Sequence, residues 1–296
     1  MADTPRLAAL IGWPLEHTLS PAIHNAAFRR LGLNWIYLAF PVHPSDLRGA
    51  VEGLAALGAA GTNVTMPHKE TVVDLMNGLS EEALVAGAVN TIDFSSGRAV
   101  GHNTDVTGFA SFLAEDTGFS SSGSSALVLG AGGAARAVVA ALDATGVKSV
   151  TVAGRMPDKA RAVAGIVRRA ETNVVALEDA AALAGRCDLV VNATPVGAGG
   201  EDVLAGADFS PGQVVIDLLY DPPATPLIAR ARAAGAEAWS GLGHLVHQAG
   251  DSFRIWTGAE PPLEVMSAAA LRNLGSRRGE AEPNDSTWDL DLPKQD

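Results

Sequence analysis

Two polar stretches in the first half of the chain could supply a proton-transfer pair. One stretch, NVTMPHK, ends at Lys69, and the other, HNTD, ends at Asp105. A lysine and an aspartate in contact can position a proton beside a hydroxyl or carbonyl group. Pro67 predicts a helix with Lys69 in its first turn, where a cation opposes the helix dipole and favours a nearby carboxylate or anionic ligand. From these residues alone, an ordinary salt bridge stays open as an alternative.

Hydroxyl and amide side chains near strand ends could bind a polar substrate beside that pair. Thr18 and Ser20 share one loop, two residues apart, so their hydroxyls could together hold a carboxylate. Taken alone, Ser20 favours another role, because it directly precedes Pro21 and suits the N-cap of a helix. Asn90, in a predicted strand within residues 85–93, adds an amide.

The stretch ALVLGAGGAAR, residues 126–136, has the pattern of a dinucleotide-binding turn. An apolar strand runs into the glycines, and an Ala/Val-rich helix follows them. Gly130 would allow the tight turn, Gly132 would let the backbone approach a pyrophosphate, and Ala135 would let the helix pack on the strand. The free N–H groups at the helix start would bind the phosphates.

The end of the next strand predicts NADP as the cofactor. About twenty residues past the glycines, an acid would bind the ribose of NAD, whereas a cation would favour the 2′-phosphate of NADP. The chain has Gly154, Arg155 and Met156 here, with no carboxylate. Arg155 could bond two phosphate oxygens through its planar guanidinium. The alternative is a solvated surface arginine.

Two later stretches carry further polar groups. NATPVG, starting at Asn192, follows an apolar strand, and ligands of doubly wound sheets bind outside the carboxyl ends of strands. We expect this stretch beside the ribose or nicotinamide, unless it is an ordinary turn. His244 and His247 share a helix face, but no carboxylate or cysteine joins them at a recognisable metal-binding spacing, so no metal is predicted.

Alternating strand and helix patterns must position these residues. Parallel strands need crossover helices, so the alternation after the glycine turn predicts a doubly wound sheet. The Ser/Gly-rich stretch 118–125 marks the boundary between two α/β units. Expected strands span residues 7–11, 35–40, 62–65, 85–93, 97–101, 126–129, 149–153, 188–192, 214–218 and 236–238, and expected helices span 21–31, 45–57, 107–115, 133–142, 242–256 and 263–274.

Composition limits the function classes. The 296 residues are 47% hydrophobic and 18% charged, which allows a large core. The formal net charge of −12 argues against nucleic acid or an anionic membrane as the main partner. The single cysteine, Cys187, excludes an internal disulfide. With neither a signal peptide nor a membrane span predicted, we expect a cytoplasmic protein.

Taken together, these segments resemble the shikimate dehydrogenase family, whose members interconvert 3-dehydroshikimate and shikimate with NADP(H). Eight stretches occur in the family's order over roughly residues 7–274, namely GWPLEHTLSPAIHN, NVTMPHK, GAVNT, NTDVTGF, GAGGAARA, NATPVG, DLLYDPPATPL and LVHQAG. The resemblance implies a small-molecule enzyme of the chorismate pathway to the aromatic amino acids. It does not decide the oligomeric state, which could be a monomer or a homodimer.

The resemblance also implies an architecture. Residues 1–105 would form an N-terminal mixed-sheet α/β domain that binds substrate and carries the catalytic groups. Residues 106–240 would form the Rossmann domain for NADP, and helices over 241–275 would return to the first domain. The acidic stretch 276–296 is expected to be disordered. Catalysis would occur in the cleft between the two domains.

Individual roles follow from the same resemblance. Lys69 and Asp105 would be the catalytic pair, Thr18 and Ser20 would hold the substrate carboxylate, and Tyr220 would close that end. Thr65, Asn90, Asp105 and Gln248 would bind the ring hydroxyls, and Gly243 would lie near the nicotinamide. Expected cofactor contacts are Gly130, Ala131, Gly132, Gly133, Ala134, Gly154, Arg155, Asn192, Ala193, Thr194, Val196, Leu218, Gly241 and His244.

The chain departs from the family's usual pattern at three places. Thr18 stands where the family has serine, and its extra methyl could alter the tolerance for quinate. Only Arg155 remains of the usual Asn-Arg-Thr after the second Rossmann strand, so the preference for NADP could be weaker. His244 stands where methionine is common beside the nicotinamide.

Three other functions were compared with this one. A quinate/shikimate dehydrogenase that uses NAD or NADP is the nearest alternative, although an acid in place of Arg155 would favour it more. Methylenetetrahydrofolate dehydrogenases also use a lysine but match the hydroxyl-binding stretches poorly. A non-catalytic NADP-binding regulatory module would be indicated by loss of Lys69 or Asp105, and both are present.

Overall fold

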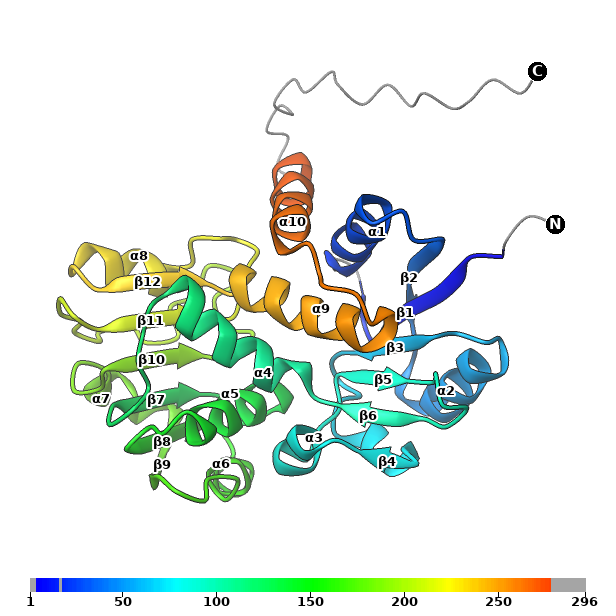
Figure 1. Ribbon diagram of the computed structural model, residues 1–296. Coiled ribbons are helices and arrows are strands. Elements are labelled where there is room, and N and C mark those ends of the chain that lie inside the picture. Colours follow the sequence, from blue (N-terminus) through cyan, green and yellow to red (C-terminus); the bar gives the residue numbers. More distant parts are fainter. Residues whose placement is uncertain (1–3, 16–17, 278–296) are drawn as a thin grey trace.

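The structure is a computed structural model that describes residues 4–15 and 18–277. It contains two six-stranded sheets that lie side by side, each with its own helices (Figure 1). Residues 6–102 build the N-terminal sheet and residues 125–240 build the C-terminal sheet. The predicted α/β fold is therefore confirmed. From residue 278 onward, the predicted tail lies outside the described residues.

The N-terminal sheet is mixed, with the strand order β2-β1-β3-β5-β6-β4. β1 pairs in parallel with β2 and β3, whereas β5 runs antiparallel to both β3 and β6. The strands are β1 (Arg6–Gly12), β2 (Trp35–Pro41), β3 (Gly61–Val64), β4 (Gly78–Leu79), β5 (Thr91–Asp93) and β6 (Val100–His102), and the helices are α1 (Ser20–Arg30), α2 (Leu47–Ala56) and α3 (Glu81–Ala86).

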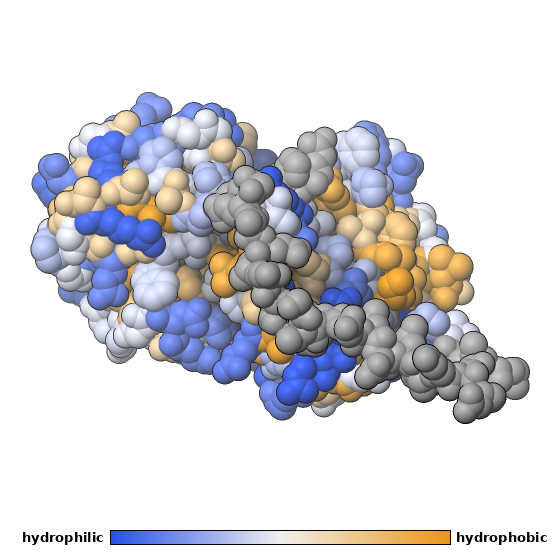
Figure 2. Space-filling view, turned by 90° about the horizontal axis from the view of Figure 1, so that it is seen from above, coloured by the Kyte–Doolittle hydropathy of each residue, from blue (hydrophilic) through white to orange (hydrophobic). Residues whose placement is uncertain are grey.

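The edge strand β2 is bonded to α1 at one residue and has an apolar outer face. The Asn25 side chain accepts a hydrogen bond from Tyr37 N at 2.8 Å and donates one to Tyr37 O at 2.9 Å, which satisfies both backbone groups of Tyr37. Ile36, Leu38 and Phe40 are partly exposed. In the view from above, apolar surface gathers over the N-terminal half, whereas the other half is more polar (Figure 2).

The C-terminal sheet is entirely parallel, with the order β12-β11-β10-β7-β8-β9. β7 lies between β8 and β10, so successive crossovers diverge there and leave a crevice at the carboxyl ends of the strands. The elements are β7 (Ser125–Leu129), β8 (Ser149–Gly154), β9 (Glu171–Ala176), β10 (Leu189–Asn192), β11 (Val214–Asp217), β12 (Glu237–Ser240), α5 (Gly133–Ala144), α6 (Pro157–Ala164), α7 (Ala181–Ala184) and α8 (Pro226–Ala233).

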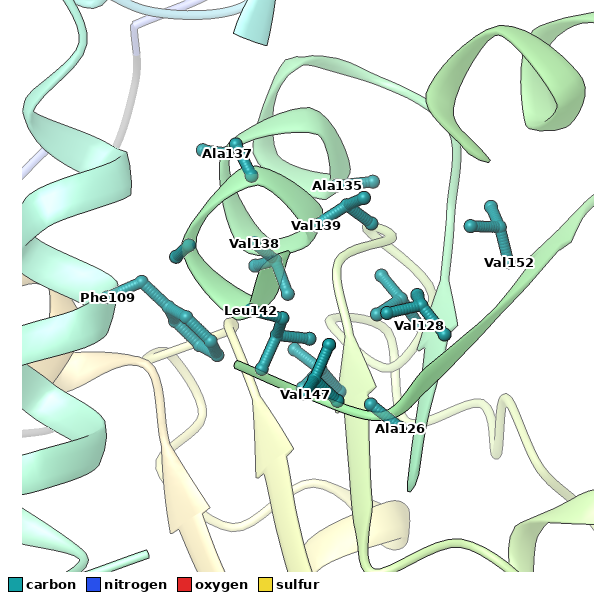
Figure 3. Close-up of a cluster of buried hydrophobic side chains, with 14 of the residues drawn as sticks. Phe109, Ala126, Val128, Ala135, Ala137, Val138, Val139, Leu142, Val147 and Val152 are labelled. Carbon is teal, nitrogen blue, oxygen red and sulfur yellow. The ribbon is translucent and has the colours of Figure 1, made fainter. Parts of the chain in front are cut away.

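Small apolar side chains let α5 pack closely on β7. Ala135 and Val128 are fully buried in this core, and Phe109 reaches across toward Val138 and Leu142 of α5 (Figure 3). The close packing fixes the start of α5, which follows the glycine turn. The N-terminal end of α5 is thereby held in place by the core beneath it.

Three helices connect the two halves. The chain leaves the N-terminal sheet through α4 (Thr104–Ser111) and returns through α9 (Leu242–Thr257), which packs along α4 (Figure 1). α10 (Leu263–Arg277) then packs on α1. Trp256 Nε1 donates to Ile92 O at 3.1 Å, so the far end of α9 is tied to β5. These contacts determine how the two sheets face each other.

Some predicted local structure is wrong, because other hydrogen bonds compete for the same groups. Lys69 is not in a helix: its carbonyl accepts from Val89 N at 2.8 Å, and only a short 3₁₀ turn follows, Thr71–Leu75. Ser20 is not an N-cap, since Thr18 Oγ1 accepts its N–H at 3.1 Å and α1 is capped at Leu19 without a side-chain bond.

Other corrections concern element limits. Asp105 lies in the first turn of α4 rather than in a loop, and Asn90 precedes β5 rather than lying within it. β9 was not predicted, because this edge strand begins with exposed Glu171, Thr172 and Asn173 and lacks a buried apolar run. Among the described residues, no helix is both long enough and apolar enough to cross a membrane.

Candidate active site

A cavity of about 480 Å³ lies where the two halves meet. Its walls come from loops after β1 and β3, from α4, from the turn after β11 and from the first turns of α9. All eight residues predicted to bind substrate line it, namely Thr18, Ser20, Thr65, Lys69, Asn90, Asp105, Tyr220 and Gln248. Ala134, Leu218, Gly241 and His244, from the predicted cofactor set, line it as well.

Lys69 and Asp105 are in direct contact at the cavity wall. Lys69 Nζ lies 2.6 Å from Asp105 Oδ2, and the two side chains are 18% and 6% exposed. Burial alone would raise the pKa of Asp105. The Lys69 ammonium and the hydrogen bonds from Lys69 and Asn90 outweigh burial and hold this pKa below its ordinary value. Asp105 is therefore a carboxylate at neutral pH.

Asn90 holds Asp105 and the start of α4 in place. Its Nδ2 donates to Asp105 Oδ1 at 2.8 Å, and its Oδ1 accepts from Thr104 N at 2.7 Å. Gln248 Oε1 lies 3.5 Å from the same Nδ2. Both carboxylate oxygens of Asp105 thus have a donor, which leaves Lys69 with two further protons to direct into the cavity.

A buried polar layer supports Asn90 from below. Asn63 Nδ2 donates to Thr91 Oγ1 at 2.9 Å and to Ser252 Oγ at 3.0 Å, and Asn63 Oδ1 accepts from the Tyr37 hydroxyl at 2.7 Å. Because these groups come from β2, β3, β5 and α9, they lock the site's supporting elements together. Sequence patterns did not indicate this layer, since its members are distant in the chain.

His244 brings an imidazole beside Lys69 and Asp105. Its Nε2 lies 3.3 Å from Asp105 O and 4.0 Å from Asp105 Oδ1. Burial lowers the pKa of His244, against an opposing effect of Asp105, so the ring is neutral at neutral pH. A carbonyl oxygen can only accept, so the Nε2 proton is donated to Asp105 O.

One end of the cavity is rich in hydroxyl groups. Thr18 Oγ1 accepts the Ser20 N–H, and its hydroxyl proton could be donated to a ligand. Burial raises the pKa of Tyr220, which keeps its hydroxyl protonated and able to donate. Arg277 Nη2 donates to Thr18 O at 2.9 Å. Sequence analysis missed Arg277, since 259 residues separate it from its partner and no local signal links them.

The glycine turn adjoins the cavity, which Ala134 lines, and its shape fits a dinucleotide. Gly130 has φ +115, and a Cβ there would lie 2.9 Å from Ala193 O. A Cβ on Gly132 would meet no atom within 4 Å, so this face of the turn is open to a ligand. No side chain caps the N-terminus of α5, which leaves its N–H groups for phosphate oxygens.

Two further residues predicted to bind the cofactor lie close to this turn. Arg155 is exposed directly after β8, and Gly130 N donates to Ala153 O at 2.8 Å, which places the turn beside the end of that strand. Gly154 is buried and a Cβ there would lie 3.6 Å from the Ala131 Cβ. The guanidinium is thus available near the turn for an anionic group.

Two residues predicted to contact the cofactor also have close protein neighbours. Asn192 is fully buried: its Nδ2 donates to Val196 O and Asp217 Oδ1, and its Oδ1 accepts from Thr194 N and Oγ1. It shapes the loop instead of facing the cavity. A Cβ on Gly243 would lie 2.5 Å from Phe112 and Asp116, so on that side only glycine fits, and its place near the nicotinamide stays a prediction.

Family models match three parts of the chain. Residues 10–92 match a shikimate dehydrogenase substrate binding domain, residues 113–198 match shikimate / quinate 5-dehydrogenase, and residues 241–271 match a shikimate 5′-dehydrogenase C-terminal domain. A shikimate dehydrogenase (NADP(+)) from Citrifermentans bemidjiense is 45% identical over 279 residues, which cover 91% of this chain and 96% of that protein. One from Methanopyrus kandleri is also 45% identical, over 90% of this chain and 96% of its own length.

Solved structures are similar over the same length. Shikimate 5-dehydrogenase from Thermus thermophilus, in complex with NADP(H) and shikimate, has a TM-score of 0.81 and 36% identity, covering 90% of this chain and 99% of its own. Quinate dehydrogenase from Corynebacterium glutamicum, in complex with NAD, has a TM-score of 0.82 and 32% identity, covering 90% and 99%.

Proposed function

The chain belongs to the shikimate dehydrogenase family, and we propose that Lys69 and Asp105 perform its proton transfer. The protein is an NADP-dependent oxidoreductase that reversibly reduces 3-dehydroshikimate to shikimate. The observation that carries the assignment of the pair is the 2.6 Å contact between Lys69 Nζ and Asp105 Oδ2 at the wall of a cavity shared by both halves.

When bound, NADPH supplies the hydride that reduces the ring ketone. The ketone oxygen gains negative charge as the hydride arrives, and the Lys69 ammonium stabilises that charge. One Nζ–H bond then breaks, and its proton forms the new hydroxyl group. Asp105 keeps the ammonium aligned, and Lys69 regains a proton from solvent. In the reverse direction Lys69 accepts the hydroxyl proton.

The rest of the cavity would orient the substrate. We propose that Thr18, Ser20 and Tyr220 bind its carboxylate, because three hydroxyl groups gather at one end of the cavity. Thr65, Asn90 and Gln248 would bind the ring hydroxyls nearer the catalytic pair. A ring held at both ends presents its reacting carbon in one orientation, which is a large part of the catalytic effect.

We propose that the two halves of the molecule bind different ligands. Residues 1–105 would bind substrate, residues 106–240 would bind NADP, and helices over 241–275 would join them. Gly130, Gly132 and the start of α5 would hold the pyrophosphate, with Arg155 on the 2′-phosphate. Asn192 would act by shaping its loop. We further propose a cytoplasmic monomer or homodimer that acts on a small-molecule substrate.

Steady-state kinetics with shikimate and quinate, each paired with NADP⁺ and NAD⁺, test the function. The highest kcat/KM is expected for shikimate with NADP⁺. A comparable kcat/KM for quinate would favour the quinate/shikimate dehydrogenase alternative.

A variant tests the catalytic pair. Lys69→Ala is expected to lower kcat by about 10²- to 10⁴-fold, with little change in the Kd of NADP⁺. Lys148→Ala is the matched control, because this exposed lysine precedes β8 at the end of the sheet away from the cavity. A near-normal kcat for Lys69→Ala would overturn the assignment.

A further inference from the structure

Arg136 crosses from the cofactor half of the molecule to the catalytic half. It lies in α5, three residues after Gly133, and its side chain is 19% exposed. Arg136 Nη1 donates to Ala86 O at 2.9 Å, at the end of α3. Arg136 Nε lies 3.5 Å from Glu70 Oε2. Both partners belong to the N-terminal sheet's half of the chain.

These two partners lie on either side of the residues that position Lys69. Glu70 directly follows Lys69. Ala86 precedes Gly87, whose φ of +59 turns the chain toward Val89 and Asn90. Val89 N donates to Lys69 O at 2.8 Å. Arg136 is therefore linked to Lys69 along two paths. One runs through Glu70, the next residue in the chain, and the other runs from Ala86 to Val89, whose N–H bonds to Lys69 O.

The same helix touches the Lys69 side chain directly. A Cβ on Gly133 would lie 3.2 Å from Lys69 Cδ and 3.3 Å from Lys69 Cβ, so the start of α5 rests on the stem of the lysine. Residues three apart share a helix face. Gly133 and Arg136 consequently contact the catalytic turn, residues 69–70, at two points. Both lie near the N-terminal end of α5, which would bind the cofactor phosphates.

The contact with Glu70 is incomplete. Arg136 Nε is buried and, within the described part of the chain, makes no hydrogen bond, although Glu70 Oε2 is only 3.5 Å away. A buried charged donor without a hydrogen bond is unfavourable. A shift of α5 toward Glu70 by a fraction of an ångström would complete the bond, and the same shift would press Gly133 against Lys69.

We propose that Arg136 is a positioning residue that couples cofactor binding at the start of α5 to substrate binding at Lys69. A cofactor bound at the glycine turn draws α5 toward the catalytic turn. Arg136 transmits this movement to Glu70 and Ala86, and Lys69 is thereby positioned to bind the substrate. The inference rests on the proposed function, since it takes Lys69 to be catalytic and α5 to hold the phosphates.

The test is a measurement of binding in a complex that cannot react. NADP⁺ and 3-dehydroshikimate are both oxidised, so their ternary complex transfers no hydride. Calorimetry would give the Kd of 3-dehydroshikimate for the full chain without NADP⁺ and with saturating NADP⁺. Wild type is expected to bind about 5- to 150-fold more tightly with NADP⁺ present, the usual range of coupling between two sites.

Arg136→Ala is expected to reduce this ratio to within about twofold of one, with each Kd measured alone changing much less. Arg136→Lys, which keeps one donor, is expected to restore part of the ratio. Glu70→Gln supplies a second variant whose substituted side chain is half exposed and well tolerated by the fold. Its ratio is expected to fall as well. Arg161→Ala, an exposed arginine paired with Asp158 on α6, is the matched control and should keep the wild-type ratio.

Wild type without coupling, or variants of Arg136 and Glu70 that keep it, would overturn the proposal. Failure of the proposed function would look different: the wild-type chain would then bind neither ligand alone, or Lys69→Ala would keep its kcat. A merely structural role for Arg136 predicts a lower melting temperature with an unchanged coupling ratio, and that result would also count against the proposal.

Discussion

Lys69 Nζ and Asp105 Oδ2 lie 2.6 Å apart, although 36 residues separate them in the chain. Lys69 stands in a turn after β3, and Asp105 in the first turn of α4. Antiparallel pairing of β5 with β3 and β6 brings the two segments to the same end of the sheet. The pair is thus a product of sheet topology, reinforced by Asn90.

Replacing Asp105 with its isosteric amide tests the electrostatic part of the pair. Asp105→Asn removes the negative charge that aligns the Lys69 ammonium, so kcat is expected to fall by about 10²- to 10⁴-fold. Steady-state rates in both directions measure the effect. Asp116→Asn is the control, because Asp116 bonds His247 outside the cavity lining and should leave kcat near the wild-type value.

Removing the Arg155 guanidinium tests cofactor choice. Arg155→Ala is expected to raise the KM of NADP⁺ by about 10- to 100-fold, the loss of one charged hydrogen-bonding group, and to leave the KM of NAD⁺ unchanged. The melting temperature should not move, since Arg155 is exposed. Arg168→Ala, another exposed arginine, serves as the comparison. Equal effects on both cofactors would argue against a 2′-phosphate contact.

Alanine at two glycines of the same turn is expected to affect different properties, stability at Gly130 and NADP⁺ affinity at Gly132. Gly130→Ala is strained at φ +115 and brings a Cβ to 2.9 Å from Ala193 O, so it should lower the free energy of unfolding by about 1–3 kcal/mol. Gly132→Ala finds open space and an extended backbone, so the fold should keep its stability while the Kd of NADP⁺ rises. Denaturant unfolding and calorimetry separate the two effects.

A buried histidine predicts acid sensitivity of the fold. His24 is fully buried among the rings of Tyr37, Phe28 and Trp256, and burial lowers its pKa to about 3. Below about pH 6.5 the unfolded chain takes up a proton that the folded chain refuses. The free energy of unfolding should therefore fall by up to about 1.4 kcal/mol per pH unit between pH 6.5 and 3.

Urea unfolding at a series of pH values measures that slope. His24→Phe keeps an aromatic ring without a titrating group, and its unfolding free energy should depend less steeply on pH over the same window. An identical slope in the variant would show that other groups cause the acid sensitivity.

One carboxylate in the Rossmann half serves stability rather than catalysis. Asp143 is 7% exposed and accepts hydrogen bonds from the backbone N–H groups of Arg168, Arg169 and Ala170. Asp143→Ala should lower the free energy of unfolding by about 3 kcal/mol, with normal kcat per folded molecule. Asp158→Ala, at a side chain 96% exposed, should change it by less than about 0.5 kcal/mol.

Local sequence patterns determined much of the secondary structure and the order of the second sheet. The glycine turn, β7 and α5 follow from contiguous residues, because close backbone approach and helix packing require small side chains at set spacings. The parallel order of the second sheet follows from alternating strands and helices. Lys69, Asp105 and Arg155 were singled out as candidates by residue type and place beside predicted strand ends, with a salt bridge and a surface arginine left open as alternatives.

Only the tertiary structure decided which partner each polar group uses. Ser20 lies in the first turn of α1 and gives its N–H to Thr18, and Asn192 is occupied because Asp217 and Val196 accept its amide protons. Arg277 and Arg136 reach the site's supporting segments across large distances in the chain. Sequence periodicity reports which face of an element is apolar. The choice among competing hydrogen-bond partners depends on distances between elements, and those distances are set by packing.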